Sequence, residues 1–248
     1  MGDCWHKKNS KFAGCVVFLK KNNQINWLAI GVAFCVTAGL VLMGMFWLDA
    51  PLYYVFTGLN FGQWAWWFEF IFDGHVWIVV SGVALILAYV IKSVKKGIKY
   101  KNDNGCICVK TWIQDGINKT VNTNAGFIFL AVLSTGLIVK GLKYGIGRIR
   151  PLIGFISDAT PTTFMPCSSD WLYNSMPSGH SAISFAGLVM IGLLMPRLKP
   201  VTWTVAVMIA VSRLMLGVHW FSDVVLGAFI GMVMADIVYS TVLKHKKK

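Results

Sequence analysis

The sequence predicts an all-α, polytopic membrane protein, and composition is the first reason. Of the 248 residues, 56% are hydrophobic and only 13% are charged, whereas about a quarter of an average soluble domain is charged. Uncharged apolar runs also recur along the chain, and several approach the roughly 17–25 residues that a helix needs to cross a bilayer. Gly and Pro are scattered, and six Cys are too few for a disulfide scaffold. A soluble globule, a disordered chain and a fibrous protein are therefore excluded.

Six apolar runs are the expected membrane-spanning helices. The first is the clearest, because it carries no charge and is too long for the core of a signal peptide. The aromatic-rich segment 52–72 that follows it is expected to lie at the membrane interface, where Trp and Tyr are favoured. The expected spans are 27–48, 75–91, 125–142, 181–195, 201–218 and 224–243. Together they predict one membrane domain that covers residues 1–248.

The basic residues give the expected orientation. Eighteen of the 23 Lys and Arg lie in the N-terminal segment 1–26, the loop 92–124, the turn after the fourth span and the C-terminus. Six spans place all four on one face, and the positive-inside rule makes that face cytoplasmic. The net charge of +13 therefore reflects topology, and no nucleic acid partner is expected. We predict a multi-pass protein of the cytoplasmic (inner) membrane with both termini in the cytoplasm.

The remaining five basic residues lie near the outer ends of the third and fifth spans. They are Lys140, Lys143, Arg148, Arg150 and Arg213. Cations at membrane depth are costly and are usually functional. Their clustering predicts an anion-binding site at the outer surface.

Three short motifs lie at these outer ends. They are Lys143-x6-Arg150-Pro151, then Pro177-Ser178-Gly179-His180, then Ser212-Arg213-x5-His219-x3-Asp223. Their order and residues resemble the three-part signature of the type-2 phosphatidic acid phosphatase superfamily. The resemblance covers about 125–243, which is the expected phosphatase core. It implies a phosphatase, and the expected topology places the active site at the face toward the periplasm or exterior.

The residue types suit phosphoryl transfer. Arg150 and Arg213 offer planar forks that match phosphate, and Lys143 adds a point charge. The backbone N–H groups of Ser178 and Gly179 precede a helix, whose N-terminus favours an anion. These five residues are the expected phosphate-binding set.

Two histidines and a carboxylate are the expected catalytic residues. His219 and Asp223 are four residues apart, so on a helix they share a face and the carboxylate can orient the ring. The resemblance implies that His219 attacks phosphorus to form a phosphohistidine. It also implies that His180 protonates the leaving oxygen. The alternative for either histidine is an interfacial residue without a catalytic role.

Other polar and small residues receive structural interpretations. Arg148 is outside the signature and is interpreted as a contact to the phosphate rim or a lipid headgroup. Lys140 is expected to extend toward the interface, and Asp236 to make a structural hydrogen bond. Two Gly-x3-Gly pairs, which begin at Gly141 and Gly227, are expected to allow close helix packing, and dimerisation through them is an alternative that the packing does not require.

No metal or other cofactor is expected. Cys106-x-Cys108 lacks the spacing and partner ligands of a zinc site. The expected outer face has no cluster of carboxylates for Mg²⁺. The cations themselves neutralise charge on phosphate.

The sequence therefore predicts a phosphatase that acts on a lipid phosphate or pyrophosphate, with membrane lipids as its surroundings. The resemblance suggests undecaprenyl pyrophosphate, phosphatidylglycerophosphate, phosphatidate or lipid A phosphate as the substrate, and the sequence does not choose among them. A lipid-to-lipid phosphotransferase of the same family is the first alternative, and a non-enzymatic membrane anion carrier is the second. The oligomeric state stays open.

Overall fold

The structure is a computed structural model, which describes residues 17–20, 22, 24–59, 67, 74–103, 123–154 and 160–246. Within these ranges the chain is predominantly helical. The β structure of the described residues consists of two isolated antiparallel bridges, Leu19 with Ile25 and Arg148 with Phe164. The expected all-α class is confirmed.

Four described helical stretches are long and apolar enough to cross a membrane. They are Trp27–Gly58, Asn124–Ile146, Pro196–Met215 and Phe221–Leu243. Two shorter apolar helices, Val76–Ile91 and Gly179–Leu194, lie where the second and fourth spans are expected. The chain is a multi-pass helical membrane protein, and the count of six crossings stays a prediction.

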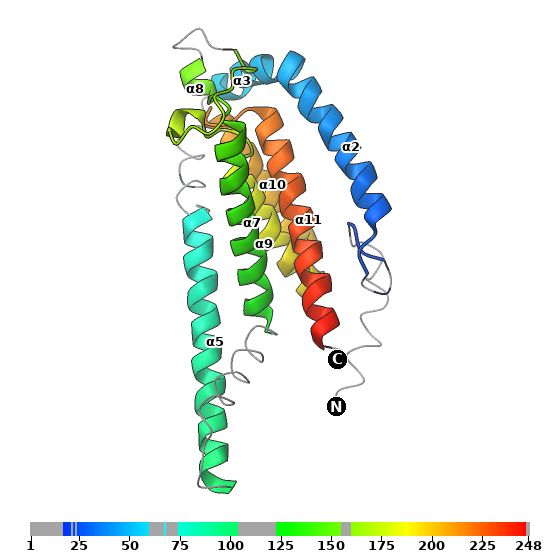
Figure 1. Cartoon of the computed structure of the whole chain (residues 1–248), viewed down its shortest axis with the longest axis vertical. Coiled ribbons are helices and arrows are strands. Elements are labelled where there is room, and N and C mark those ends of the chain that lie inside the picture. The colour runs from blue at the N-terminus through cyan, green and yellow to red at the C-terminus, as the bar shows by residue number, and fades with distance from the viewer. Residues whose placement is uncertain are drawn as a thin grey trace.

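The first stretch changes direction at a π-helical turn. Helix α2 (Trp27–Met43) runs into η2 (Gly44–Leu48), which leads into α3 (Asp49–Gly58). A π turn is a common cause of a sharp kink. Figure 1 shows α3 lying across the upper end of the bundle, where it packs against α10 and α11. The segment expected at the interface thus begins in α3, and most of its remainder lies outside the described residues.

Helix α5 (Gly74–Asp103) is longer than the expected second span. Its C-terminal third therefore makes the start of the polar loop 92–124 helical, while 104–122 lies outside the described residues. The apolar part of α5 packs against α7 (Asn124–Ile146) and α9. These contacts place α5 beside the core of the bundle (Figure 1).

Helix α9 (Gly179–Leu194) is the centre of the bundle and packs against α7, α10 (Lys199–Met215) and α11 (Phe221–Lys246). A Cβ on Gly227 or Gly231 of α11 would collide with the backbone of α9, so this glycine pair permits close packing as expected. A Cβ on Gly141 or Gly145 would meet no atom of a neighbouring element within 4 Å among the described residues. For that pair, close helix packing stays a prediction.

The N-terminal segment is attached to the end of the bundle where α11 finishes. The N–H of Phe18 donates to Oδ2 of Asp236 at 2.9 Å, and the Phe18 ring packs edge-on against Phe229 of α11. The structural hydrogen bond expected for Asp236 is confirmed.

The other end of the bundle gathers the helix ends that carry the three motifs. Helix α7 finishes there at Gly147, whose φ of 62° is the left-handed conformation that glycine adopts readily. The start of α9, the end of α10 and the start of α11 lie at the same end (Figure 1). Three short helices complete the described chain, namely α8 (Pro151–Gly154), η3 (Trp171–Tyr173) and η4 (Pro196–Leu198).

Candidate active site

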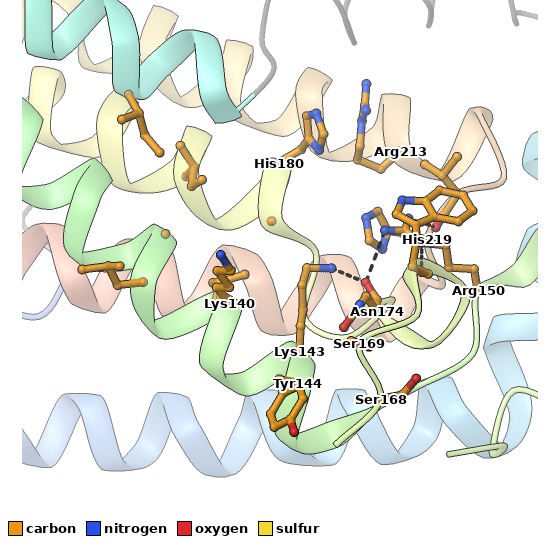
Figure 2. A pocket seen from close by; sticks show the side chains of 18 of the residues that line it. Lys140, Lys143, Tyr144, Arg150, Ser168, Ser169, Asn174, His180, Arg213 and His219 are labelled. Carbon is orange, nitrogen blue, oxygen red and sulfur yellow. Dashed lines mark hydrogen bonds between the residues drawn. The ribbon is translucent and has the colours of Figure 1, made fainter. Parts of the chain in front are cut away.

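A cavity of about 840 Å³ opens where the three motifs meet (Figure 2). This volume lies within the range of ligand pockets, roughly 300–1,000 Å³. Six of the eight expected site residues line it, namely Lys143, Arg150, Gly179, His180, Arg213 and His219. The other two, Ser178 and Asp223, are buried behind its wall. Motifs that are far apart in sequence are thus assembled into one site.

Two cations of the first motif converge on one carbonyl group. Lys143, in the last turn of α7, donates from Nζ to the carbonyls of Asn174 and Ser175. Arg150 donates from Nη2 to the same Asn174 carbonyl at 3.3 Å (Figure 2). Its guanidinium also lies 4.1 Å from the ring centre of Trp171, over the aromatic face. Backbone and aromatic contacts thereby hold both positive charges at the cavity.

Arg213 supplies the third cation from the last turn of α10. The residue is buried, and its Nε and Nη2 lie 3.3 and 3.2 Å from the hydroxyl of Ser212. A positive charge in the last turn of a helix also interacts favourably with the helix dipole. The cavity therefore has a strongly positive end, as an anion site requires.

The second motif places a helix N-terminus at this positive end. Helix α9 begins at Gly179, with Ser178 as its N-cap residue. The N–H groups of a first helical turn have no partner within the helix, so they favour an anion. Ser178 differs from the expectation, because its own N–H donates to the carbonyl of Asp223 at 2.9 Å. Lys143 Cε would lie 3.7 Å from a Cβ on Gly179, so the lysine stem covers the glycine.

His219 and Asp223 face each other, although they do not share a helix. His219 precedes α11, whose first turn contains Asp223. The Trp220 N–H donates to Asp223 Oδ2 at 3.0 Å, which is one half of a capping box. His219 Nδ1 lies 3.6 Å from the same oxygen and 3.5 Å from the Ser175 hydroxyl. The carboxylate distance is slightly beyond a hydrogen bond, and the turn before α11 sets the direction of the ring.

The imidazole of His219 is buried, and its surroundings favour the neutral form. Burial lowers its pKa well below the usual range for histidine, and the charges of Lys143 and Arg150 act in the same direction. The neighbouring Asp223 carboxylate acts in the opposite direction but does not outweigh burial. With Nδ1 turned toward Asp223, the second ring nitrogen, Nε2, has a free lone pair in the neutral form that donates from Nδ1. A neutral ring with this orientation is able to act as a nucleophile.

His180 approaches the same cavity from another element. It is the second residue of α9 and lines the cavity together with His219 (Figure 2). A proton donor and a nucleophile on different elements can reach opposite sides of one phosphorus atom.

Comparison with known proteins places this arrangement in a family. The model of the PAP2 superfamily matches residues 124–247, which is half of the chain. The chain belongs to the PAP2 superfamily. This confirms the resemblance carried by the three motifs.

Individual relatives of this PAP2 chain are lipid phosphatases by name. It is 33% identical to a lipid A 1-phosphatase of Rhizobium etli over 117 residues, which cover 46% of the chain and 50% of that protein. It is 28% identical to lipid phosphate phosphatase 2 of Arabidopsis thaliana over 160 residues, 54% of the chain and 55% of that protein. It is 29% identical to diacylglycerol pyrophosphate phosphatase 1 of Saccharomyces cerevisiae over 141 residues, 44% of the chain and 48% of that protein. The chain thus spans about half the length of these relatives, and no solved structure gave a significant match.

The PAP2 site contains an ionic network that the sequence did not indicate. Arg148 is fully buried, and its Nη1 lies 2.6 Å from Asp223 Oδ1 while its Nη2 lies 2.7 Å from Asp49 Oδ2. Nη1 also donates to the Ser222 hydroxyl at 2.6 Å. The interpretation of Arg148 as a rim contact to phosphate or a headgroup was therefore wrong. The sequence did contain one signal for this network. Asp49 is one of only ten acidic residues and ends a long uncharged run, and a charge at such a position usually has a partner.

The cavity wall also has an apolar part. Ile78 of α5, four α7 residues and Ile183 of α9 line this part. The α7 residues are Leu133, Gly136, Leu137 and Val139. Lys140, one turn before Lys143, also lines the cavity. The interfacial position expected for it stays a prediction. The described residues include no group of three or more His, Cys, Asp or Glu side chains that could hold a metal ion.

Proposed function

We propose that this PAP2 protein is a membrane phosphatase that hydrolyses a lipid phosphate or pyrophosphate through a phosphohistidine. The observation that carries the proposal is one cavity whose lining is partly cationic and partly aliphatic. Lys143, Arg150 and Arg213 line it together with the histidines, and aliphatic side chains of α5, α7 and α9 line it as well, with Lys140 among those of α7. A molecule that matches both kinds of lining has an anionic head and an apolar tail.

The proposed reaction has two displacement steps at phosphorus. Nε2 of neutral His219 attacks, and the bond from phosphorus to the leaving oxygen breaks. Protonated His180 gives its proton to that oxygen, which leaves as an alcohol or as a lipid monophosphate. Water then attacks the phosphohistidine, His180 takes a proton from it, and inorganic phosphate and free His219 are released. The three cations neutralise the charge on the non-bridging oxygens throughout.

The substrate class is supported by the named relatives, which act on lipid A, lipid phosphates and diacylglycerol pyrophosphate. Undecaprenyl pyrophosphate, phosphatidylglycerophosphate, phosphatidate and lipid A phosphate all combine a phosphate head with a long apolar tail. The cavity would bind the head at the outer side of the cytoplasmic membrane, while the tail stays in the bilayer. Because the cations already neutralise the phosphate, we propose that no metal takes part.

The two histidines give the sharpest test of this mechanism. The full chain is purified in detergent, and phosphate release is measured in EDTA from phosphatidate and from p-nitrophenyl phosphate. His219→Ala is expected to abolish release from both, because the nucleophile is lost. His180→Ala is expected to lose about 10²–10⁴-fold on phosphatidate and much less on p-nitrophenyl phosphate, whose leaving group needs little protonation.

Trapping the intermediate separates the two roles further. With an activated, radiolabelled substrate, the His180→Ala protein is expected to accumulate acid-labile phosphoenzyme, and the His219→Ala protein is expected to carry no label. Labelling of the His219→Ala protein would contradict the nucleophile assignment. Equal losses of the His180→Ala protein on both substrates would remove His180 from the acid role. Label that passes from wild-type protein to a second lipid, with none released as inorganic phosphate, would favour the phosphotransferase.

A further inference from the structure

We propose that Asp49 and Arg148 are positioning residues for the nucleophile, and that they act on His219 only through Asp223. The proposal rests on the proposed function, because it assigns His219 the attacking role. Neither residue is among the side chains that line the cavity. Both are buried behind it, in a network that joins the first half of the chain to the third motif.

The geometry divides the two oxygens of Asp223 between two tasks. Oδ1 accepts from Arg148 at 2.6 Å. Oδ2 accepts from the Ser175 hydroxyl and the Trp220 N–H, and it is the oxygen that faces His219 Nδ1. Because Arg148 holds one oxygen, the carboxylate cannot rotate, and the other oxygen stays directed at the ring.

Asp49 in turn fixes Arg148 and its surroundings. Its Oδ2 lies 2.7 Å from Arg148 Nη2 and accepts from the Ser222 hydroxyl, while its Oδ1 accepts from the Ser222 N–H at 3.0 Å. The Arg148 Nε donates to the Pro161 carbonyl at 2.8 Å. The guanidinium therefore has partners on three sides, and its fork can adopt only one direction.

Charge gives Asp49 a second task. A single buried Arg148 beside Asp223 would form a neutral pair, which would leave little negative potential to stabilise the positive charge that develops on His219 during attack. With Asp49 on the far side of the guanidinium, the group of two carboxylates and one cation has a net charge of about −1. Asp49 thereby keeps Arg148 from fully neutralising Asp223, so the Asp223 carboxylate keeps the negative charge that stabilises a positive His219 ring.

The experiment uses Asp49→Asn, which keeps the shape of the side chain and removes the charge. In full-length protein with phosphatidate, kcat is expected to fall on the order of 10- to 100-fold, the range of coupling within one buried network. KM is expected to change little, because Asp49 does not line the cavity. The same fold loss is expected with p-nitrophenyl phosphate, because both substrates need the same attack. This result differs from that expected for His180→Ala.

A double-mutant cycle tests whether Asp49 acts through Asp223. In an Asp223→Asn background, adding Asp49→Asn is expected to change kcat by less than about 3-fold, because the route to the ring is already broken. A loss of the same size in both backgrounds would overturn the proposal, because it would indicate a general effect on folding. Wild-type protein that releases no phosphate from any substrate would instead contradict the proposed function.

The pKa of His219 is a readout that does not need activity. Protein labelled with ¹⁵N-histidine is titrated by NMR, and the His219 signal is identified by its loss in His219→Asn. Asp49→Asn is expected to lower the pKa of His219, because a negative charge that favours the imidazolium is removed. Asp236→Asn is the matched control, since it alters another buried carboxylate on the far end of α11. An unchanged pKa in Asp49→Asn, or an equal shift in Asp236→Asn, would overturn the proposal.

Discussion

The carbonyl oxygen of Asn174 fixes two of the three cations at the cavity, since Lys143 and Arg150 both donate to it. The same short segment supplies Trp171, whose ring covers the Arg150 guanidinium and whose carbonyl accepts from Arg150 Nε at 3.1 Å. The uncharged segment 171–175 thereby determines where these two positive charges lie. Its residues contribute to phosphate binding through the cations that they hold.

Replacing Trp171 tests this dependence. Trp171→Ala removes the aromatic face but keeps the backbone carbonyls, so Arg150 becomes less well ordered. We expect KM for phosphatidate, and the inhibition constant for inorganic phosphate, to rise about 2- to 30-fold, as loss of a cation–π contact implies. Trp171→Phe is the matched control and is expected to keep most of the binding. A fall in kcat without a change in either constant would contradict this role.

Sequence reasoning found most of the motif residues that line the cavity but missed the buried residues behind it. Lys143, Arg150 and His219 belong to short motifs with fixed spacing, so a local pattern was sufficient. Asp49 and Arg148 are 99 residues apart, and no spacing rule joins them. Their pairing arises because η2 turns α3 across the end of the bundle, and a change of direction of this kind is set by tertiary packing.

Helices α9 and α11 meet at glycines, and this contact reaches the site itself. A Cβ on Gly227 would lie against the carbonyl of Ser178, the N-cap of α9, while one on Gly231 would meet the backbone at Ala182. The separation between the two helices therefore also sets the distance between the second and third motifs. A small residue here serves both helix packing and the relative placement of the two motifs.

Two glycine substitutions provide a matched pair at the scale of the helices. Gly231→Ala is expected to destabilise the protein by about 1–3 kcal/mol, because the methyl group meets backbone that cannot move aside cheaply. Gly141→Ala is expected to be neutral or slightly stabilising, because no described atom of another element lies nearby and Ala is the better helix former. Thermal unfolding in one detergent measures both. Equal shifts in midpoint would contradict the packing argument.

The two glycine pairs also show where the sequence was ambiguous. Both have the same four-residue spacing, yet α11 packs its pair against α9 while the α7 pair has no described neighbour. The spacing identifies a face that could accept a helix, and only the arrangement of the bundle determines whether one is there. In contrast, the apolar runs located the helices well, because length and the absence of charge decide membrane crossing locally.

At the scale of the whole molecule, the helix ends divide into two groups. One end of the bundle contains the cavity, and the other contains the attachment of Phe18 to Asp236. The basic residues divide in the same way, with most of them in segments that the sequence assigns to the cytoplasm. Both divisions favour a single orientation of the protein in the membrane.

Reporter fusions test that orientation. Fusions after Asp73 and after Ser168 are expected to read as external, and a fusion after Asn104 as cytoplasmic, because the basic segments stay inside. The measurement is the ratio of alkaline phosphatase to green fluorescent protein signal at each position. The reverse pattern would overturn both the topology and the proposed leaflet of the substrate.

The Asp49–Arg148 contact has a consequence for engineering this protein. Arg148 lies within the region matched by the family model, whereas Asp49 lies outside it. In a chimera that exchanged residues 124–247 alone, the incoming Arg148 would keep Asp223 but lose Asp49, and the buried Asp49 carboxylate would face a foreign half. The smallest transplantable unit of this PAP2 scaffold therefore includes α3, and substitutions at Asp49 and Arg148 are expected to occur together.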